Sequence, residues 1–284
     1  MFKVIVMTIE QFVKLCKEED IKDGDHSALA CIPENEVDKA KLLVKADGII
    51  AGIEVAKALF KEFDPNVEIE QLLNDGDRVK YGDIAFYVVC NSRALLSAER
   101  LVLNVMQRMS AIATKTRDFV DAVGELSTKV LDTRKTTPLI RFLEKQAVKI
   151  GGGENHRMGL YDMIMLKDNH IDFAGGVKQA IQKTKAYLKA NDLNLKIEVE
   201  TRNLNEVRMV LEEGGIHRIM LDNFSYDEIR EAVKLIDGKY ETEASGGINL
   251  DTVRVFAECG VDYVSVGALT HSVYNMDLSL KAVK

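Results

Sequence analysis

The sequence predicts an α/β protein with two regions, a small mixed α/β unit followed by a parallel β/α barrel. After about residue 123 the chain alternates short apolar strands with helical segments, the pattern of parallel β/α units. The last four predicted strands end at a regular spacing of 22 residues, at Glu200, Asp222, Ala244 and Val266. This spacing suits one strand, one helix and two loops. Because six strands are clear, we expect an incomplete barrel, with a doubly wound open sheet as the alternative.

The first region mixes one helical pattern with short strands. Residues 54–63 carry apolar side chains at helical spacing, and residues 76–89 are typical of turn, strand, turn and strand, with Gly76 and Gly82 in the turns. A long helical pattern over residues 92–123 keeps an apolar face near the 3.6-residue period and links the two regions.

The second region contains the predicted barrel strands, and the residues that follow each strand test its function. In β/α barrels the chemistry lies at the carboxyl ends of the strands. The short sequences at these ends are TRK, KDNH, ET, DN, SGG and G. Ordinary turns would explain DN and SGG, but they explain KDNH and TRK less well. The strands are expected at residues 129–132, 163–168, 196–200, 218–222, 240–245 and 262–267.

Composition limits the classes of protein that fit. The chain has 284 residues, 46% of them hydrophobic, which is enough for a sizeable core. A net charge of −7 argues against general nucleic-acid binding. An acidic residue at position 10 argues against a secretion signal, and the lack of an 18-residue apolar run argues against a membrane span. Four well-separated cysteines fit reduced thiols in a cytoplasmic protein, without a zinc site or disulfides, at Cys16, Cys31, Cys90 and Cys259.

Cations gather at the predicted strand ends of this acidic protein. Arg134 and Lys135 follow the first strand, His156 and Arg157 follow three consecutive glycines, and Lys167 closes an apolar strand. So much positive charge in one pocket would repel itself unless the pocket receives a multiply anionic ligand. Arginine suits carboxylates, and lysine serves as a compact charge for phosphate. For residues 132–141, taken alone, a solvated basic loop is the alternative.

Two acids and two glycine-rich ends complete the predicted site. Glu200 and Asp222 close successive strands, and carboxylates near phosphates suit Mg²⁺ or sugar hydroxyls, although pairing with the nearby cations is the alternative. The sequences SGGI at 245–248 and SVG at 265–267 end the last two strands, where barrels bind phosphate through backbone N–H groups. No nucleophile pair and no tight His/Cys metal site is evident. Transfer chemistry by positioning and electrostatics is therefore favoured.

Several motifs, in this order, resemble those of one enzyme family. In the second region these are DTRKTTP, GGGENHR, MLKDNHI, IEVE, LDNF, EASGGI and VDYVSVGALTHS; in the first they are DGDHSALACIP, ADGIIAG, NDGDRVKYGDIA and SAERLVLN. Together they resemble nicotinate-nucleotide pyrophosphorylase (carboxylating), also called quinolinate phosphoribosyltransferase. The resemblance covers nearly the whole chain.

The resemblance implies a reaction, a fold and an assembly. Quinolinate and phosphoribosyl pyrophosphate would give nicotinate mononucleotide, pyrophosphate and carbon dioxide, with Mg²⁺, in NAD biosynthesis. The fold would be an N-terminal α/β sandwich over residues 1–112, joined by the C-terminal tail 273–284, and an open, incomplete β/α barrel over residues 113–272. Members work as homodimers with active sites at the interface, some in larger assemblies.

The resemblance also assigns roles to individual residues. It implies that the two quinolinate carboxylates are held by Arg134, His156, Arg157 and Lys167, beside Thr133. Arg100 would reach the neighbouring subunit's site. Lys135 would face the pyrophosphate, while Glu200 and Asp222 would bind ribose hydroxyls and the Mg²⁺ environment, so that Lys135, Lys167, Glu200 and Asp222 form the catalytic set. The 5′-phosphate would lie on Ser245, Gly246, Gly247, Ser265, Val266 and Gly267, near His271.

Two positions depart from the family pattern, and two other functions remain open. Leu139 stands where the family commonly has glycine, and Ala111 replaces a glycine in the long helix. We expect the first to alter the loop geometry more than the activity. The alternatives are a related pyrophosphorylase with a different acceptor, of the molybdenum-transport-associated type, and a non-catalytic module that binds phosphorylated metabolites.

Overall fold

The chain forms two compact units in a computed structural model that describes residues 7–283. The expectation about a secretion signal concerns the N-terminal stretch 1–12, of which residues 1–6 lie outside the described residues. The first unit comprises the chain up to Arg117, Thr137–Gly152 and the chain from Ser272; the second comprises Asp118–Thr136 and Gly153–His271. No helix in the described part of the chain is long and apolar enough to cross a membrane.

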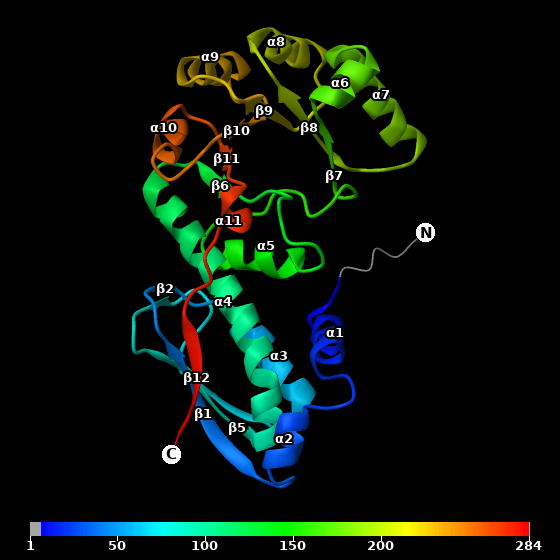
Figure 1. Cartoon of the computed structure of the whole chain (residues 1–284). Coiled ribbons are helices and arrows are strands. Elements are labelled where there is room, and N and C mark those ends of the chain that lie inside the picture. Colours follow the sequence, from blue (N-terminus) through cyan, green and yellow to red (C-terminus); the bar gives the residue numbers. More distant parts are fainter. Residues whose placement is uncertain (1–6, 284) are drawn as a thin grey trace. The chain divides into compact units, whose positions relative to one another are not determined.

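The first unit is built on a four-stranded antiparallel sheet with the order β12-β1-β5-β3 (Figure 1). From Ala40 in β1 and from Phe86 in β5, buried and more accessible positions alternate, so one face of the sheet enters the core. The chain's last strand pairs with β1, with Leu280 opposite Leu42, so the C-terminal segment completes this sheet. The strands are β1 (Val37–Val44), β3 (Glu68–Gln71), β5 (Ile84–Asn91) and β12 (Leu278–Ala282), with a separate pair formed by β2 (Gly48–Ile49) and β4 (Arg78–Val79).

Helices of the first unit pack beside this sheet, and two of them begin at side-chain caps. Thr8 forms a capping box with Gln11 at the start of α1, and Asp25 accepts the amide of Ala28 in α2. Phe60 of α3 meets Phe86 of β5 edge-on, with ring centroids 6.2 Å apart. The helices are α1 (Ile9–Ile21), α2 (His26–Cys31), α3 (Ile53–Phe63), α5 (Arg141–Ile150) and α4 (Ser92–Val123), whose last residues enter the second unit.

The segment Thr137–Gly152 groups with the first unit, whereas the sequence prediction placed it in the barrel. Two contacts explain this. The buried carboxylate of Glu144 accepts both the amide and the hydroxyl of Thr137, and it pairs with Arg108 of α4 at 2.8 Å. The backbone at Gly151 passes so close to α4 that an added Cβ would lie 2.4 Å from the carbonyl oxygen of Ala113. The first glycine of GGGENHR is therefore required by close packing.

The second unit contains a six-stranded, all-parallel sheet with the order β6-β11-β10-β9-β8-β7. Neighbours follow the chain order from β7 to β11, and the last strand then pairs with the first. A doubly wound sheet would reverse direction at its centre, so this order defines an incomplete barrel, open between β6 and β7. The strands are β6 (Lys129–Leu131), β7 (Met163–Leu166), β8 (Lys196–Thr201), β9 (Arg218–Asp222), β10 (Glu241–Ser245) and β11 (Tyr263–Ser265).

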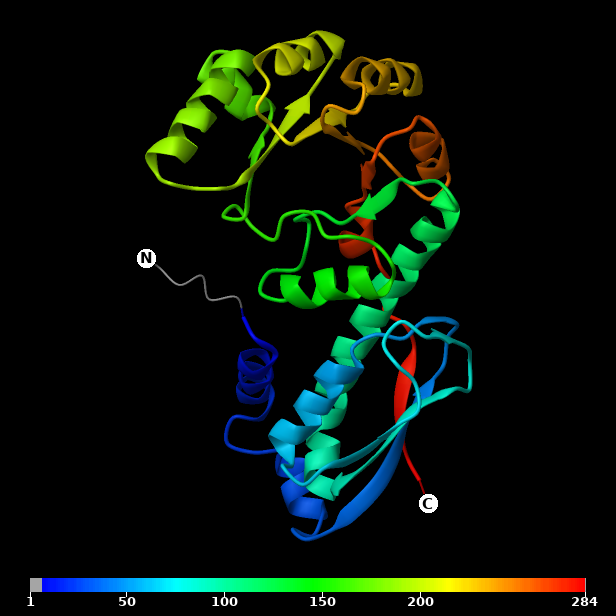
Figure 2. The same cartoon turned by 180° about the vertical axis from the view of Figure 1, so that it is seen from behind.

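Helices α6 to α10 cover the outer side of this sheet, as Figure 2 shows from behind. Consecutive helices contact each other, and Asn203 and Ser225 cap α8 and α9. The carboxyl ends of the strands are thereby left to line one hollow. These helices are α6 (Asp168–Ala174), α7 (Val177–Ala190), α8 (Leu204–Glu213), α9 (Tyr226–Ile236) and α10 (Val253–Glu258); the short α11 (Ala268–His271) follows β11.

Leu139 occupies a backbone conformation that glycine normally adopts. Its φ is 68° and its side chain is 78% exposed. A Cβ in this left-handed region costs about 1–2 kcal/mol, and the exposed side chain regains little by packing. Leucine therefore keeps the turn that a glycine would allow, at a cost in stability.

We expect Leu139→Gly to stabilise the protein by up to about 1 kcal/mol, since relief of backbone strain exceeds the roughly 0.5–1 kcal/mol entropic cost of glycine. The midpoint of chemical unfolding measures this. Leu139→Ala is the matched control because it removes the same exposed atoms but keeps the Cβ, and it should stay within about 0.5 kcal/mol of the unmodified protein. Equal midpoints for both variants would contradict the strain argument.

Candidate active site

A cavity of about 730 Å³ lies at the carboxyl ends of the barrel strands, and every residue that lines it belongs to the second unit. Its size suits a small-molecule ligand. Val266 is buried beneath it and does not line it, and Arg100 lies exposed on α4 in the first unit. The remaining predicted site residues all line the cavity: Thr133, Arg134, Lys135, His156, Arg157, Lys167, Glu200, Asp222, Ser245, Gly246, Gly247, Ser265, Gly267 and His271.

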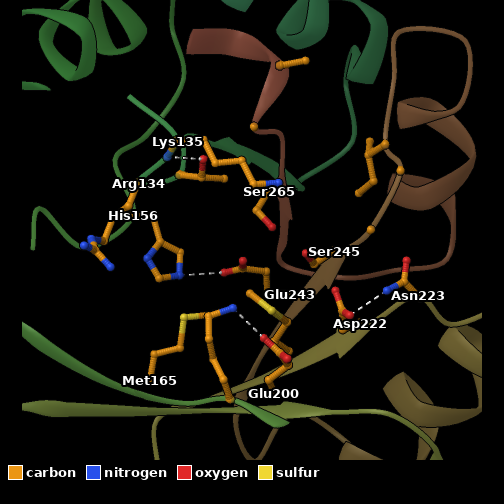
Figure 3. A pocket seen from close by; sticks show the side chains of 18 of the residues that line it. Arg134, Lys135, His156, Met165, Glu200, Asp222, Asn223, Glu243, Ser245 and Ser265 are labelled. Atoms are coloured by element: carbon orange, nitrogen blue, oxygen red, sulfur yellow. Dashed lines mark hydrogen bonds and ion pairs between the residues drawn. The ribbon is translucent and has the colours of Figure 1, made fainter. Parts of the chain in front are cut away.

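The segment after β6 brings two cations to the cavity. The amide of Lys135 donates to the hydroxyl of Thr133 at 3.1 Å, and the hydroxyl of Thr270 donates to the carbonyl of Lys135 at 2.8 Å. The Lys135 side chain passes Gly267, where a Cβ would lie only 2.9 Å from Lys135 Cδ. The lack of a side chain at Gly267 therefore leaves room for this lysine. Arg134 lines the same hollow, and Figure 3 shows it beside His156.

Asp132 anchors the loop that carries His156 and Arg157, and the sequence analysis assigned it no role. Its buried carboxylate accepts the amide of His156 at 2.9 Å through Oδ1 and the side-chain amide of Asn155 at 2.6 Å through Oδ2. The carboxylate thus ties the ENHR segment to the end of β6. An aspartate directly after an apolar strand was the available signal.

Three cations of the cavity have no carboxylate partner within ion-pair distance in the described part of the chain: Arg134, Lys135 and Arg157. Arg157 is the most enclosed of them. Burial lowers the pKa of its guanidinium, and the charge of Arg134 lowers it further. Lys167 differs, because its Nζ lies 2.9 Å from Glu200 Oε2. The cavity thus presents an excess of positive charge that an anionic ligand would neutralise.

The rest of the KDNH motif serves the helix that follows β7. The amide of Lys167 donates to Nδ1 of His170 at 3.0 Å, and α6 begins at Asp168. Asp168, Asn169 and His170 do not line the cavity. Of this motif, only Lys167 faces the hollow.

Asn223 is a second residue that the sequence analysis missed. Its Nδ2 donates to Asp222 Oδ2 at 2.6 Å, and its amide donates to the carbonyl of Ser245 at 2.9 Å. Its φ of 57° places it in the left-handed region, which asparagine tolerates. A Cβ on Gly246 would lie 2.2 Å from Asn223 Oδ1. The side chain of Asn223 therefore orients Asp222 and occupies the space beside the glycine turn.

The turn after β10 has the backbone that an anion cradle needs. Gly246 and Gly247 have φ values of 104° and 65°, both in the left-handed region. Ser245 and Ser265 end the adjacent strands β10 and β11 and line the same part of the cavity. Successive glycine amides in such turns bind phosphate well.

Two buried glutamates lie at the cavity, with Glu243 among its lining residues and Glu198 outside them, and the sequence analysis assigned them no role. Glu198 and Glu243 are fully buried, and burial raises the pKa of each to about 7. Arg218 Nη1 lies 2.8 Å from Glu243 Oε2, and His156 Nε2 lies 2.8 Å from Glu198 Oε2. The alternation of KIEVE placed Glu198 on the same face as Glu200, which was the available signal.

These features define a class of protein. Among the described residues, cations without carboxylate partners follow β6 and α5, two acids lie at the ends of β8 and β9, and a glycine turn follows β10. Such a site suits a phosphorylated sugar beside a polyanionic acid, the two kinds of ligand that a phosphoribosyl-transferring enzyme takes.

Comparisons with known proteins identify the family. Residues 25–110 match the family model of the quinolinate phosphoribosyl transferase N-terminal domain, and residues 112–281 match that of its C-terminal domain. The chain belongs to the quinolinate phosphoribosyltransferase family.

Curated relatives and solved structures agree along almost the full length. Quinolinate phosphoribosyltransferase [decarboxylating] 2b, mitochondrial, of Nicotiana tabacum is 46% identical over 288 residues, covering 96% of this chain and 82% of the relative. The probable nicotinate-nucleotide pyrophosphorylase [carboxylating] of Bacillus subtilis is 41% identical, covering 92% and 89%. The crystal structure of NadC from Streptococcus pyogenes has a TM-score of 0.92 at 38% identity, with full coverage of both chains. The resemblance noted in the sequence is confirmed.

The raised pKa of Glu243 predicts how stability depends on pH. Its pKa of about 7 in the folded protein exceeds the ordinary glutamate pKa of 4.5, so the folded state binds a proton more tightly than the unfolded state does. The contribution of this tighter protonation to the free energy of unfolding is fully present below pH 4.5. It is lost as the pH rises through about 7. Between pH 5 and pH 8, the free energy of unfolding should therefore fall by about 1–3 kcal/mol less in Glu243→Gln than in the unmodified protein.

Chemical unfolding at the two pH values measures this difference. Glu241→Gln is the matched control, since Glu241 also pairs with Arg218, at 3.0 Å, but is 37% exposed. The control should follow the pH dependence of the unmodified protein. If Glu243→Gln follows it as well, the buried carboxyl does not carry the effect.

Proposed function

We propose that the protein transfers the phosphoribosyl group of phosphoribosyl pyrophosphate to quinolinate and decarboxylates the product. The products are nicotinate mononucleotide, pyrophosphate and carbon dioxide, and the reaction belongs to de novo NAD biosynthesis. It is a pentosyl transfer, in agreement with the names of the relatives. One observation carries the proposal: three cations without carboxylate partners in the described part of the chain line the same cavity as two acids and a glycine cradle.

Each group in the cavity has a chemical task. The quinolinate carboxylates lie against Arg134, Arg157 and Lys167, and the arginines offer planar donor pairs for them. The 5′-phosphate lies on the turn at Gly246 and Gly247. The same cavity also contains Thr133, His156, Ser245, Ser265, Gly267 and His271.

The transfer step needs charge stabilisation more than covalent chemistry. The pyridine nitrogen attacks C1 of the ribose, the new C–N bond forms, and the C–O bond to pyrophosphate breaks with its electron pair on the leaving group. Positive charge develops on the sugar, and the carboxylates of Glu200 and Asp222 stabilise it. Lys135 neutralises the departing pyrophosphate. Because Thr133 and Thr270 hold the Lys135 backbone, this charge is positioned before the reaction.

Decarboxylation follows from the charge on the ring. Once the nitrogen is quaternary, the bond from C2 to its carboxylate breaks and the electron pair stays on C2, beside N⁺. That adjacent charge stabilises the carbanion until it takes a proton. Lys135 and Lys167 are the candidates for this proton transfer, since both line the cavity.

Mg²⁺ belongs to this proposal, and the donor set fits it. Asp222 has one oxygen engaged by Asn223, which leaves the other for a ligand, whereas Glu200 already pairs with Lys167. A hard cation held by few protein carboxylates usually takes its other ligands from water and from substrate phosphates. When bound, Mg²⁺ would supply charge neutralisation at the pyrophosphate.

A cytoplasmic homodimer completes the proposal. All four cysteines are free thiols, which suits a reducing compartment. Arg100 is exposed on α4 and belongs to the first unit, so a second subunit could receive its guanidinium. Larger assemblies built from such dimers are compatible with this arrangement.

Purified protein supplied with quinolinate, phosphoribosyl pyrophosphate and Mg²⁺ should release carbon dioxide and nicotinate mononucleotide in equal amounts. Nicotinate is the matched control acceptor because it lacks the 2-carboxylate, and it should yield little product. Absence of carbon dioxide with quinolinate would favour the related pyrophosphorylase with another acceptor. Binding of phosphoribosyl pyrophosphate without turnover would indicate a non-catalytic module.

Arg157→Ala should raise the KM for quinolinate by about tenfold or more and change that for phosphoribosyl pyrophosphate by less than about threefold, because a charge-assisted bond to carboxylate is worth roughly 1.5–3 kcal/mol. Steady-state kinetics with each substrate varied in turn measure this. Arg230→Ala is the control, since Arg230 pairs with Asp227 on the exposed face of α9. Equal losses for both substrates would contradict the assignment.

Mixing an Arg100→Ala chain with a Lys167→Ala chain should restore activity. Each hybrid dimer keeps one intact site if Arg100 acts in its neighbour's barrel. Random reassembly then recovers about a quarter of the unmodified activity, since about half of the dimers are hybrids with one working site. Either variant alone should stay inactive after the same treatment. If mixing recovers nothing, Arg100 does not act across the interface.

A further inference from the structure

Strand β7 passes directly into helix α6, and Lys167 is the single residue between them (Figure 1). We infer that His170 is a positioning residue: its imidazole holds the backbone amide of Lys167 and thereby fixes the direction in which the Lys167 ammonium enters the cavity. This role rests on the proposed function for the identity of the anion that Lys167 binds.

Lys167 occupies a position that does not suit a lysine. It is the N-cap residue of α6, where Ser, Thr, Asp and Asn are favoured because their side chains accept a helix amide. A lysine ammonium only donates, and positive charge is unfavourable at a helix N-terminus. Among the described residues, α6 accordingly has no side-chain cap bond from Lys167. A residue that departs from a local preference while lining a cavity is there for its function.

Two other helices show what a complete cap looks like in this protein. At α1 the amide of Thr8 donates to Gln11 Oε1 at 3.0 Å, and the amide of Gln11 donates to the Thr8 hydroxyl at 3.2 Å. At α9 the amide of Ser225 donates to Glu228 Oε2 at 2.9 Å, and the amide of Glu228 donates to the Ser225 hydroxyl at 3.4 Å. Each of these helix starts is held by two reciprocal bonds.

His170 supplies the half of this arrangement that a lysine cap still allows. It is the third residue of α6, as Gln11 and Glu228 are in their helices, and its Nδ1 accepts the amide of Lys167 at 3.0 Å. The carbonyl of Lys167 accepts the amide of Ile171, also at 3.0 Å. The backbone of Lys167 is therefore held on both sides.

The direction of the Lys167 side chain depends on this backbone. Side chains alternate between the two faces of a strand, so Lys167 shares its face with Met165, and both line the cavity. The Lys167 side chain is 47% exposed, so packing contributes little to its orientation, and its ammonium contacts Glu200 Oε2 at 2.9 Å. His170 itself is exposed and does not line the cavity, so it acts on a ligand only through Lys167.

Calorimetry with the full chain tests this role. His170→Ala should weaken quinolinate binding about fivefold, because the ammonium loses its fixed direction, and should leave phosphoribosyl pyrophosphate binding within about twofold. His170→Gln should restore quinolinate binding to within about twofold of the unmodified protein, since glutamine already accepts the cap amide in α1. Failure of glutamine to restore binding would overturn the inference.

Glu228→Ala is the matched control, because it removes the same kind of bond at the start of α9, and neither Ser225 nor Glu228 lines the cavity. It should leave the binding of both ligands within about twofold. Equal weakening by Glu228→Ala and His170→Ala would show a general effect of helix caps and would overturn the inference. If the unmodified protein binds no quinolinate, the proposed function fails and this role fails with it. If it binds quinolinate and His170→Ala binds it equally well, only this role fails.

A double-mutant cycle tests whether His170 acts through the Lys167 ammonium. Lys167→Met removes the charge and keeps a long apolar side chain. In that background His170→Ala should change quinolinate binding by less than about 1.5-fold, because the group being aimed is already gone. Losses that multiply would show an effect independent of Lys167 and would overturn the inference.

Backbone amide exchange, followed by NMR, detects the bond itself without any ligand. The Lys167 amide should exchange at least about tenfold faster in His170→Ala than in the unmodified protein, and His170→Gln should restore its protection. Thermal unfolding of each variant shows whether the chain is folded. Unchanged exchange of the Lys167 amide in folded His170→Ala would overturn the inference.

Discussion

Unneutralised positive charge inside one cavity is the constraint on which the rest of this structure depends. Arg134, Lys135 and Arg157 line the same hollow, where burial and the charge of Arg134 lower the pKa of Arg157. A buried acid of the barrel offsets part of that charge. Glu198 acts on Arg157 from the buried layer, although its own charge is disfavoured by burial. The site therefore carries an excess of positive charge that an anionic ligand would neutralise.

Precision at this site comes from short polar links behind the charged groups. Asp132 holds the loop of His156, Thr270 holds the carbonyl of Lys135, and Asn223 holds one oxygen of Asp222. None of these links adds net positive charge to the cavity. Each removes conformational freedom from a charged neighbour, so less entropy is lost when the ligand binds. The long cationic side chains can thus act as positioned groups.

Particular residues show how far the sequence could predict this arrangement and where it could not. The end positions of KIEVE and RIMLD identified Glu200 and Asp222 because strand periodicity depends only on local order. The link between Asn223 and Gly246 escaped prediction because it joins two strand ends through space. Thr137–Gly152 belongs to the first unit, where Glu144 contacts both Thr137 and Arg108. No local sequence pattern encodes these contacts.

The sequence by itself determined the α/β class, the alternation of strands and helices in the barrel, the strand-end residues and the family, because each depends on local periodicity or on motifs. Tertiary structure alone decided that β11 pairs with β6 and that the sheet stays open between β6 and β7. It also decided which partner each charge receives. Lys167 is paired with Glu200 while Arg157 has no such partner among the described residues. Such pairings depend on distances across strands, and one-dimensional order does not contain those distances.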